Sequence, residues 1–360
     1  MNYYRFISKS IIALLSCITG LLSCGNDNNI PTNEIHYTTI DNNVLPIEDL
    51  FYFGAGRIVS NSYDPDKNVC ILKLDKDVTE IEKEPFKDCE SLTSISLPPS
   101  AIEIGDSAFF SCSNLTFITI PESITKIGEM AFYSCLRLKS IFIPESVTKI
   151  GQWAFRGCRN LTSISVSKDN KFYDSREDCN AIIHTDSNTL ISGCKNTVIP
   201  LSVTKIKNFA FSGCSSLTSI TIPESVTEIE GGAFEGCSGL TSIAIPSSVR
   251  KIGKGAFYGC SRLTSISIPE SVTKIEDWGF WDCSSLMSIS IPESVTEIGD
   301  WPFYGCSSLT SITIPKSVTE LRDWTFNGCS SLTEVRIPKR CEVKDDAFSG
   351  CPANLVITRY

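Results

Sequence analysis

The sequence predicts a mainly β solenoid, in which short strands stack along one axis. Three observations lead to this prediction. One phrase of 23 residues recurs along most of the 360-residue chain. Each copy alternates apolar and polar residues in the way typical of a short strand. Each copy is also too short to bury its apolar face alone, so it needs its neighbours. We therefore expect one stack of repeats rather than two or three globular domains.

The repeat period is marked by the cysteine that ends each Phe-x-x-Cys motif. Successive cysteines are 23 residues apart, except for one step of 56 after the fourth and a last step of 22. A Phe lies three residues before each cysteine, and a Leu lies three residues after all but the last. Fixed apolar sites at a fixed period indicate that each unit is one coil of a solenoid. The cysteines are Cys89, Cys112, Cys135, Cys158, Cys214, Cys237, Cys260, Cys283, Cys306, Cys329 and Cys351.

The first element of each unit is predicted to be a short strand on the concave face. Residues 217–222, which read LTSITI, alternate apolar and polar side chains and so give one buried and one outward face. Pro223 ends the strand because proline cannot donate to a ladder. Stacked coils would pair these strands into a parallel sheet, with about 4.8 Å between neighbours.

The rest of the unit predicts a second extended segment and then a turn. Val226 and Ile229 point inward from the segment SVTEI. Residues 232–237, which read GAFEGC, are too short for an α-helix and carry an apolar pair three residues apart. We therefore predict a single helical or 3₁₀ turn on the convex side of each coil.

The step of 56 residues holds an insertion of 33 residues (56 minus 23), placed at about 166–199. Two apolar segments, 181–184 and 189–192, flank the turn-forming residues Asp186, Ser187 and Asn188. This pattern predicts a hairpin.

The consensus L-x-x-I-x-I-P-x-S-V-T-x-I-x-x-x-A-F-x-G-C-S-S resembles the 23-residue leucine-rich repeat of the BspA-like family. The resemblance covers about residues 70–360, and the insertion is similar to a variant unit of that family. It implies a leucine-rich-repeat solenoid over 70–360. It also implies a surface or secreted protein of a host-associated microbe, because several family members are implicated in adhesion to host extracellular proteins and to other microbes.

The N-terminal segment, residues 1–23, resembles a bacterial lipoprotein signal peptide. Arg5 and Lys9 precede an apolar stretch, 10–22, that is too short to span a bilayer comfortably. Residues 21–24 read LLSC, which resembles a lipobox, and the resemblance implies lipid on Cys24. The same four letters end at Cys17, but cleavage there leaves too short an apolar stretch.

Residues 24–69 are expected to form a polar tether and an N-terminal cap on the first coil. Several acyl chains on Cys24 would anchor the protein stably in the cell envelope, at the outer membrane or cell surface. Simple secretion without lipid is the alternative.

Composition excludes several function classes. The net charge of −9 argues against nucleic acid as a partner and against electrostatic docking to anionic lipid, which leaves a lipid anchor as the membrane contact. His36 and His184 are the two histidines, and no phosphate-binding loop, nucleophile elbow or paired-carboxylate motif is present. We therefore expect neither an enzyme nor a cofactor.

The repeat cysteines occupy one structural site, so we expect them to form a buried column of free thiols. In-register neighbours point the same way, which suits a disulfide torsion poorly. The absence of a Cys-x-x-Cys pair argues against a metal site. Cys179 and Cys194 lie outside the column and could bridge the insertion hairpin.

Two departures from the consensus are candidate binding sites. The first is on the strand face, where outward positions are mostly Ser and Thr but Phe117 and Phe142 replace them on adjacent strands. Diagonal neighbours on adjacent strands lie within reach of each other, and exposed aromatic side chains could hold a ligand. Packing under the N-terminal cap is the alternative reading.

The second departure is a set of aromatic residues beside the repeat Phe. Positions two before and one after that Phe are three apart and would share one face of a turn. Trp and Tyr dominate binding hot spots and stack on sugars. The rings could instead cover gaps between coils or mediate self-association. The predicted contiguous patch comprises Tyr258, Trp278, Trp281, Trp301, Tyr304 and Trp324.

The function that the sequence favours is adhesion, through binding of an extracellular protein or glycan of host or microbial origin. One alternative is a glycan-binding surface lipoprotein with the aromatic residues as its site. Another is a structural envelope protein without a specific ligand. The sequence does not choose a ligand, because solenoids present a surface and not a motif.

Overall fold

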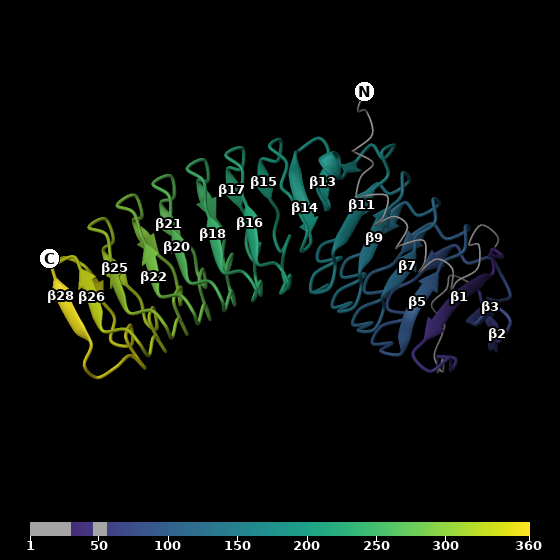
Figure 1. The fold of residues 1–360 in the computed structure, drawn as a ribbon, viewed down its shortest axis with the longest axis horizontal. Coiled ribbons are helices and arrows are strands. Elements are labelled where there is room, and N and C mark those ends of the chain that lie inside the picture. The colour runs from purple at the N-terminus through teal and green to yellow at the C-terminus, as the bar shows by residue number, and fades with distance from the viewer. Residues whose placement is uncertain (1–29, 46–55) are drawn as a thin grey trace, which may run out of the picture.

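The computed structural model describes residues 30–45 and 56–360. The expected signal peptide and Cys24 lie outside the described residues. Figure 1 shows one curved solenoid that runs from a small sheet beside β1 to β28. The mainly β leucine-rich-repeat solenoid predicted from the sequence is confirmed.

The first side of each coil is a short strand, and these strands form a row of parallel pairs. Outward positions are exposed and the central residue is buried, as in β18, β20 and β22. The register steps by one repeat, so that Ile220 pairs with Ile243. The row comprises β5 (Leu92–Ser96), β7 (Phe117–Thr119), β9 (Ser140–Ile143), β11 (Ser163–Val166), β16 (Ser219–Thr221), β18 (Ser242–Ala244), β20 (Ser265–Ser267), β22 (Ser288–Ser290), β24 (Ser311–Thr313), β26 (Glu334–Ile337) and β28 (Val356–Arg359).

The second side is a row of two-residue strands. In most of them the first residue is charged and the second is a buried apolar residue. Lys and Glu from successive coils form ion pairs here, such as Lys251 with Glu228 at 3.0 Å. The row comprises β4 (Glu80–Ile81), β6 (Glu103–Ile104), β8 (Lys126–Ile127), β10 (Lys149–Ile150), β15 (Lys205–Ile206), β17 (Glu228–Ile229), β19 (Lys251–Ile252), β21 (Lys274–Ile275), β23 (Glu297–Ile298), β25 (Glu320–Leu321) and β27 (Glu342–Val343).

The third side of each coil is a run of tight turns rather than the helical or 3₁₀ turn that the sequence predicted. Alternate N–H groups bond within the coil and to the next coil: Tyr258 donates to Gly255 O at 3.0 Å, and Phe257 donates to Gly279 O at 3.1 Å. This alternation needs left-handed backbone at two positions per coil, such as Gly255 (φ +61°) and Gly259 (φ +66°). In a right-handed helix every N–H points along the helix axis and would bond within the same coil. The observed turns instead direct alternate N–H groups to the next coil, and these bonds hold the coils together.

The core is built from the Phe and Cys columns. Phe rings of successive coils stack with centroids 5.3 Å apart for Phe86 and Phe109, and 5.5 Å apart for Phe234 and Phe257. The thiols in the described residues are free, and most are buried. The buried Cys260 Sγ donates to the Phe234 carbonyl oxygen of the preceding coil at 3.2 Å, a role that the sequence did not reveal.

The possible Cys179–Cys194 bridge is not formed. Both side chains are buried free thiols, and Cys194 Sγ donates to the Asn180 carbonyl oxygen at 3.3 Å. The hairpin therefore owes its stability to its strand pairing and its packing rather than to a cross-link.

An antiparallel sheet covers the N-terminal end of the stack. It comprises β1 (Glu34–Thr39), β2 (Ile58–Asp64) and β3 (Val69–Leu74), and β1 pairs antiparallel with β5. The buried Tyr37 hydroxyl donates to Asn61 Oδ1 at 2.6 Å and accepts from the Leu45 N–H. The sheet thus covers the edge of the first strand row, which would otherwise present unpaired backbone groups.

The insertion takes the place of one coil. It contains β12 (Tyr173–Asp174), the 3₁₀ turn η2 (Arg176–Asp178), β13 (Ala181–His184) and β14 (Thr189–Gly193). The strands β13 and β14 pair antiparallel, and β14 then pairs parallel with β15.

Among the described residues, no helix has the length and apolar character needed to cross a bilayer.

Candidate functional site

The structure brings the six aromatic residues predicted from the C-terminal coils into one contiguous cluster, which we call the aromatic patch. The Trp281 ring lies at its centre, 4.3 Å from Tyr304, 5.9 Å from Tyr258 and 5.8 Å from Trp301 between ring centroids. Trp301 also contacts Trp278 at 6.1 Å and Trp324 at 6.0 Å. The repeat period explains this contiguity, because equivalent positions on successive coils become neighbours.

Tight turns place the two positions of each coil on one side. The Trp281 N–H donates to the Trp278 carbonyl oxygen at 3.2 Å, which closes a turn and brings both indoles to the same surface. The shared face predicted from the sequence is therefore present, but a turn with left-handed residues produces it.

Three tryptophans of the patch have left-handed backbone. Their φ angles are +57° at Trp278, +52° at Trp301 and +58° at Trp324. The preceding coils carry Gly232 and Gly255 at the same position, each with φ +61°. Glycine adopts this conformation freely, whereas a bulky residue there is strained by roughly 1–3 kcal/mol.

The patch is partly open to solvent and has one charged edge. Trp324 is 42% exposed, and the other five side chains are half-buried. Lys254 Nζ lies 4.1 Å from the Trp278 ring centroid and 3.1 Å from Asp277 Oδ2. Trp278 Nε1 is buried without a hydrogen-bond partner. Such a surface suits contact with apolar, aromatic or sugar groups.

One titratable side chain of the patch, Tyr258, has a shifted pKa. Burial raises the pKa of the Tyr258 hydroxyl, and the nearby Asp282 and Glu235 raise it further. The phenol therefore stays neutral near pH 7 and can donate a hydrogen bond.

Phe117 and Phe142 lie on the strand face, on β7 and β9. Phe142 is 46% exposed and Phe117 is half-buried. Ser140 is the repeat equivalent of Phe117, so Phe142 is diagonal to it, and within the described part of the chain no ring contact joins the two. The structure does not bring these residues together with the aromatic patch, which lies on the turn side of distant coils.

A shallow groove runs over the strand face of the four coils that carry β16, β18, β20 and β22, with a volume of ≈ 680 Å³. It is uncharged, and most of its outward side chains carry hydroxyls. The Ser/Thr ladder in the sequence is the signal for it, but the hollow itself depends on the curvature of the stack. The outward residues that line it are Ser219, Thr221, Ser242, Ala244, Ser265, Ser267, Ser288 and Ser290.

A family model described as the BspA type leucine rich repeat region matches this chain in six copies, over residues 57–179, 189–284 and 251–358. The chain belongs to this BspA-type leucine-rich-repeat family. No curated protein matches the sequence.

Solved structures support the family fold. A leucine-rich repeat protein from Eubacterium ventriosum is similar with 24% identity and a TM-score of 0.59, covering 76% of this chain and 88% of that one. The pneumococcal vaccine antigen PcpA is similar with 26% identity and a TM-score of 0.59, covering 78% of this chain and 66% of that one. Proteins of this family and fold are typically not enzymes.

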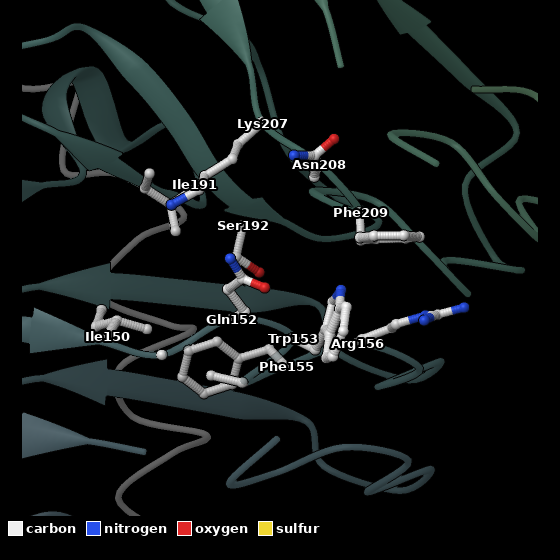
Figure 2. Close-up of a pocket in the computed structure, with 12 residues that line it drawn as sticks. Ile150, Gln152, Trp153, Phe155, Arg156, Ile191, Ser192, Lys207, Asn208 and Phe209 are labelled. Carbon is white, nitrogen blue, oxygen red and sulfur yellow. The ribbon is translucent and has the colours of Figure 1, made fainter. Parts of the chain in front are cut away.

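The BspA-type chain also has a pocket that the sequence did not predict. Figure 2 shows the residues that line it, which come from β10 and the turn that follows it, from β14 and from the turn after β15. Its volume is ≈ 290 Å³. In the sequence, only the length of the insertion indicated that the stack is interrupted here.

Across the described residues, no group of three or more His, Cys, Asp or Glu side chains could hold a metal ion.

Proposed function

We propose that this BspA-type protein is displayed at the cell surface and mediates adhesion, by binding an extracellular protein through the aromatic patch. The observation that carries the proposal is the patch itself, in which five ring contacts link six aromatic side chains into one cluster. Rings of this kind are the residues that most often dominate binding energy.

Neighbouring coils argue against a purely structural role for these rings. At the position of Trp278, the two preceding coils carry Gly232 and Gly255, yet their backbone bonds to the next coil are intact. Gly255 donates to Asp277 O at 2.9 Å, and Trp278 donates to Asp300 O at the same distance. Stacking of coils therefore does not require a ring at this position, where other coils carry Glu84, Ser107 and Met130 on the same left-handed backbone.

Display at the surface is supported by the family and by one matched structure. BspA-like proteins are surface or secreted proteins, and the matched pneumococcal protein is named as a vaccine antigen, which fits exposure outside the cell. We also infer that Cys24 carries the lipid anchor, on the likeness of residues 21–24 to a lipobox.

The anchor is tested by the variant Cys24→Ala. Wild-type protein should fractionate with membranes and incorporate labelled palmitate, whereas the variant should do neither, because several acyl chains are needed for stable attachment. Incorporation of the label by the variant would refute lipidation at this residue.

Adhesion is tested by a binding screen of the chain from residue 25 onward against extracellular-matrix proteins and polysaccharides. The test variant is Trp278→Gly/Trp301→Gly, since glycine suits the left-handed backbone there. The control is Trp153→Gly, at the equivalent position of a distant coil (φ +57°). We expect a matrix-protein signal that the double variant loses and the control keeps.

Other outcomes would favour other functions. A matrix-protein signal that survives the double variant contradicts the patch as the site. A polysaccharide signal that the double variant loses supports the glycan-binding alternative. Silence across the whole panel would leave a structural envelope role.

A further inference from the structure

The insertion breaks the regular stack and leaves a seam in the solenoid. The Phe ring stack reaches Phe155 and starts again at Phe211, and the apolar core divides into two clusters near this point. Gly193 of β14 packs against Phe211, where a Cβ would lie 2.1 Å from the ring. The inserted strand therefore replaces a coil without supplying its Phe.

Aromatic rings on the two sides of the seam meet differently from rings in the regular stack. Trp153 and Phe209 occupy the position two before the repeat Phe, with φ +57° and +60°. Their centroids are 5.8 Å apart and their planes are inclined by 74°. At the same position in regular coils, Trp278 and Trp301 are nearly parallel, inclined by 6°. The rings of Trp153 and Phe209, one on each side of the seam, therefore line the same pocket.

The outer wall of this space is held in place by Arg156. Its guanidinium lies 4.5 Å from the Phe209 ring centroid, Nε donates to Ser212 Oγ at 3.2 Å, and Nη2 pairs with Glu235 Oε1 at 2.7 Å. All of these contacts cross the seam. The pocket is therefore formed before any ligand binds, which lowers the cost of binding.

Polar side chains complete the lining, namely the cationic Lys207 and three uncharged groups. The side chains of Gln152, Ser192 and Asn208 line the pocket, and none of them has a hydrogen-bond partner in the described part of the protein. In Figure 2, Gln152 and Ser192 lie close together in the middle of the view. No acidic side chain lines the pocket. Amides and hydroxyls both donate and accept, as sugar hydroxyls do.

We propose that this seam pocket binds one neutral pyranose unit of a glycan. Its volume is near the lower end for small-ligand sites, which suits a single ring. The Trp153 and Phe209 rings offer apolar surface to the C–H face of the sugar. Gln152, Ser192 and Asn208 offer bonds to its hydroxyls. The site is separate from the aromatic patch, so it does not depend on the proposed adhesion.

Saturation-transfer NMR on the chain from residue 25 onward tests this proposal. The probes are the methyl glycosides of glucose, galactose, mannose and N-acetylglucosamine. We expect saturation transfer to at least one of them. Asn208→Ala and Gln152→Ala change exposed side chains, so the fold should persist, and each should weaken that affinity about tenfold through a lost hydrogen bond.

Two further variants separate the seam from the patch. Trp153→Gly should abolish the signal, because it removes a ring from the pocket, while Trp301→Gly should leave it unchanged. The proposal is overturned if none of the four sugars receives saturation, if affinity is unaltered in Asn208→Ala and Trp153→Gly, or if Trp301→Gly abolishes the signal. Should Trp153→Gly fail to fold by circular dichroism, the Asn208→Ala titration decides.

Discussion

On the turn side of each coil, the backbone conformation limits which residues fit without strain. Two positions per coil are left-handed, and glycine fills many of them, such as Gly232 and Gly236. At the first of these positions, however, glycine occurs at Gly232 and Gly255 alone among the described coils, and Glu84 and Met130 share the left-handed backbone of the tryptophans. The sequence showed that the tryptophans recur, but not that they stand on left-handed backbone, because the apolar pair three residues apart fits a helical turn equally well.

Trp301 provides a direct test of this backbone strain. We expect Trp301→Ala to destabilise the protein more than Trp301→Gly does, by about 1 kcal/mol, since alanine keeps the strain and glycine relieves it. Both variants lose the same ring contacts, so the difference isolates the backbone. Chemical denaturation measures the two free energies of unfolding, and equal values would contradict the left-handed assignment.

The thiols of the Cys column are expected to resist modification. Burial raises the pKa of Cys158 and of Cys260 to about 12, whereas the half-buried Cys89 and Cys351 are raised to about 11. Alkylation with iodoacetamide at mildly alkaline pH, followed by mass spectrometry, should label Cys89 and Cys351 first. Early labelling of Cys260 would show that the column is open.

The same thiols give the stability a definite pH dependence. The thiol pKa is higher in the folded state than the ordinary value of 9.0, so the folded state holds more protons above that pH. The free energy of unfolding should therefore be unaffected by these groups below about pH 9 and should fall as pH rises toward 12.

At the scale of elements, the strands could be predicted because alternation and proline mark them directly. The aromatic patch could be predicted as well, because a fixed period brings equivalent positions together. The seam pocket could not, since its walls come from the coil that follows β10, from β14 and from the turn after β15, and nothing local says that β14 joins the second row. The hairpin was visible in the sequence, but its docking on Phe211 was not.

Gly193 is the element-scale test of that docking. Gly193→Ala should destabilise the protein by roughly 1–3 kcal/mol, because its Cβ would lie 2.1 Å from the Phe211 ring and force the hairpin away. The control is Gly279→Ala. Gly279 occupies the position of Ala233 and Ala256 in other coils, so alanine should be tolerated there. A denaturation midpoint for Gly193→Ala that matches the control would show that β14 does not pack as described.

For the whole molecule, the stack is a repeated scaffold, and our proposals place binding at its departures from regularity. The cap closes one end, and the repeated core holds each coil against the next. Surfaces that differ from the consensus, namely the aromatic patch and the seam, are then held at fixed positions along the stack. This arrangement is what a long adhesive surface requires, because rigid positioning lowers the cost of binding.

The central claim is that the aromatic patch holds an extracellular partner, and Trp281 tests it directly because its ring contacts three others. The measurement is the Kd of the matrix protein found in the screen, for wild type, Trp281→Ala and the control Phe142→Ala on the strand face. We expect Trp281→Ala to weaken binding about 30-fold, as loss of a hot-spot ring does, while Phe142→Ala leaves it unchanged. An unchanged Kd in a folded Trp281→Ala variant, or a loss confined to Phe142→Ala, would contradict the claim.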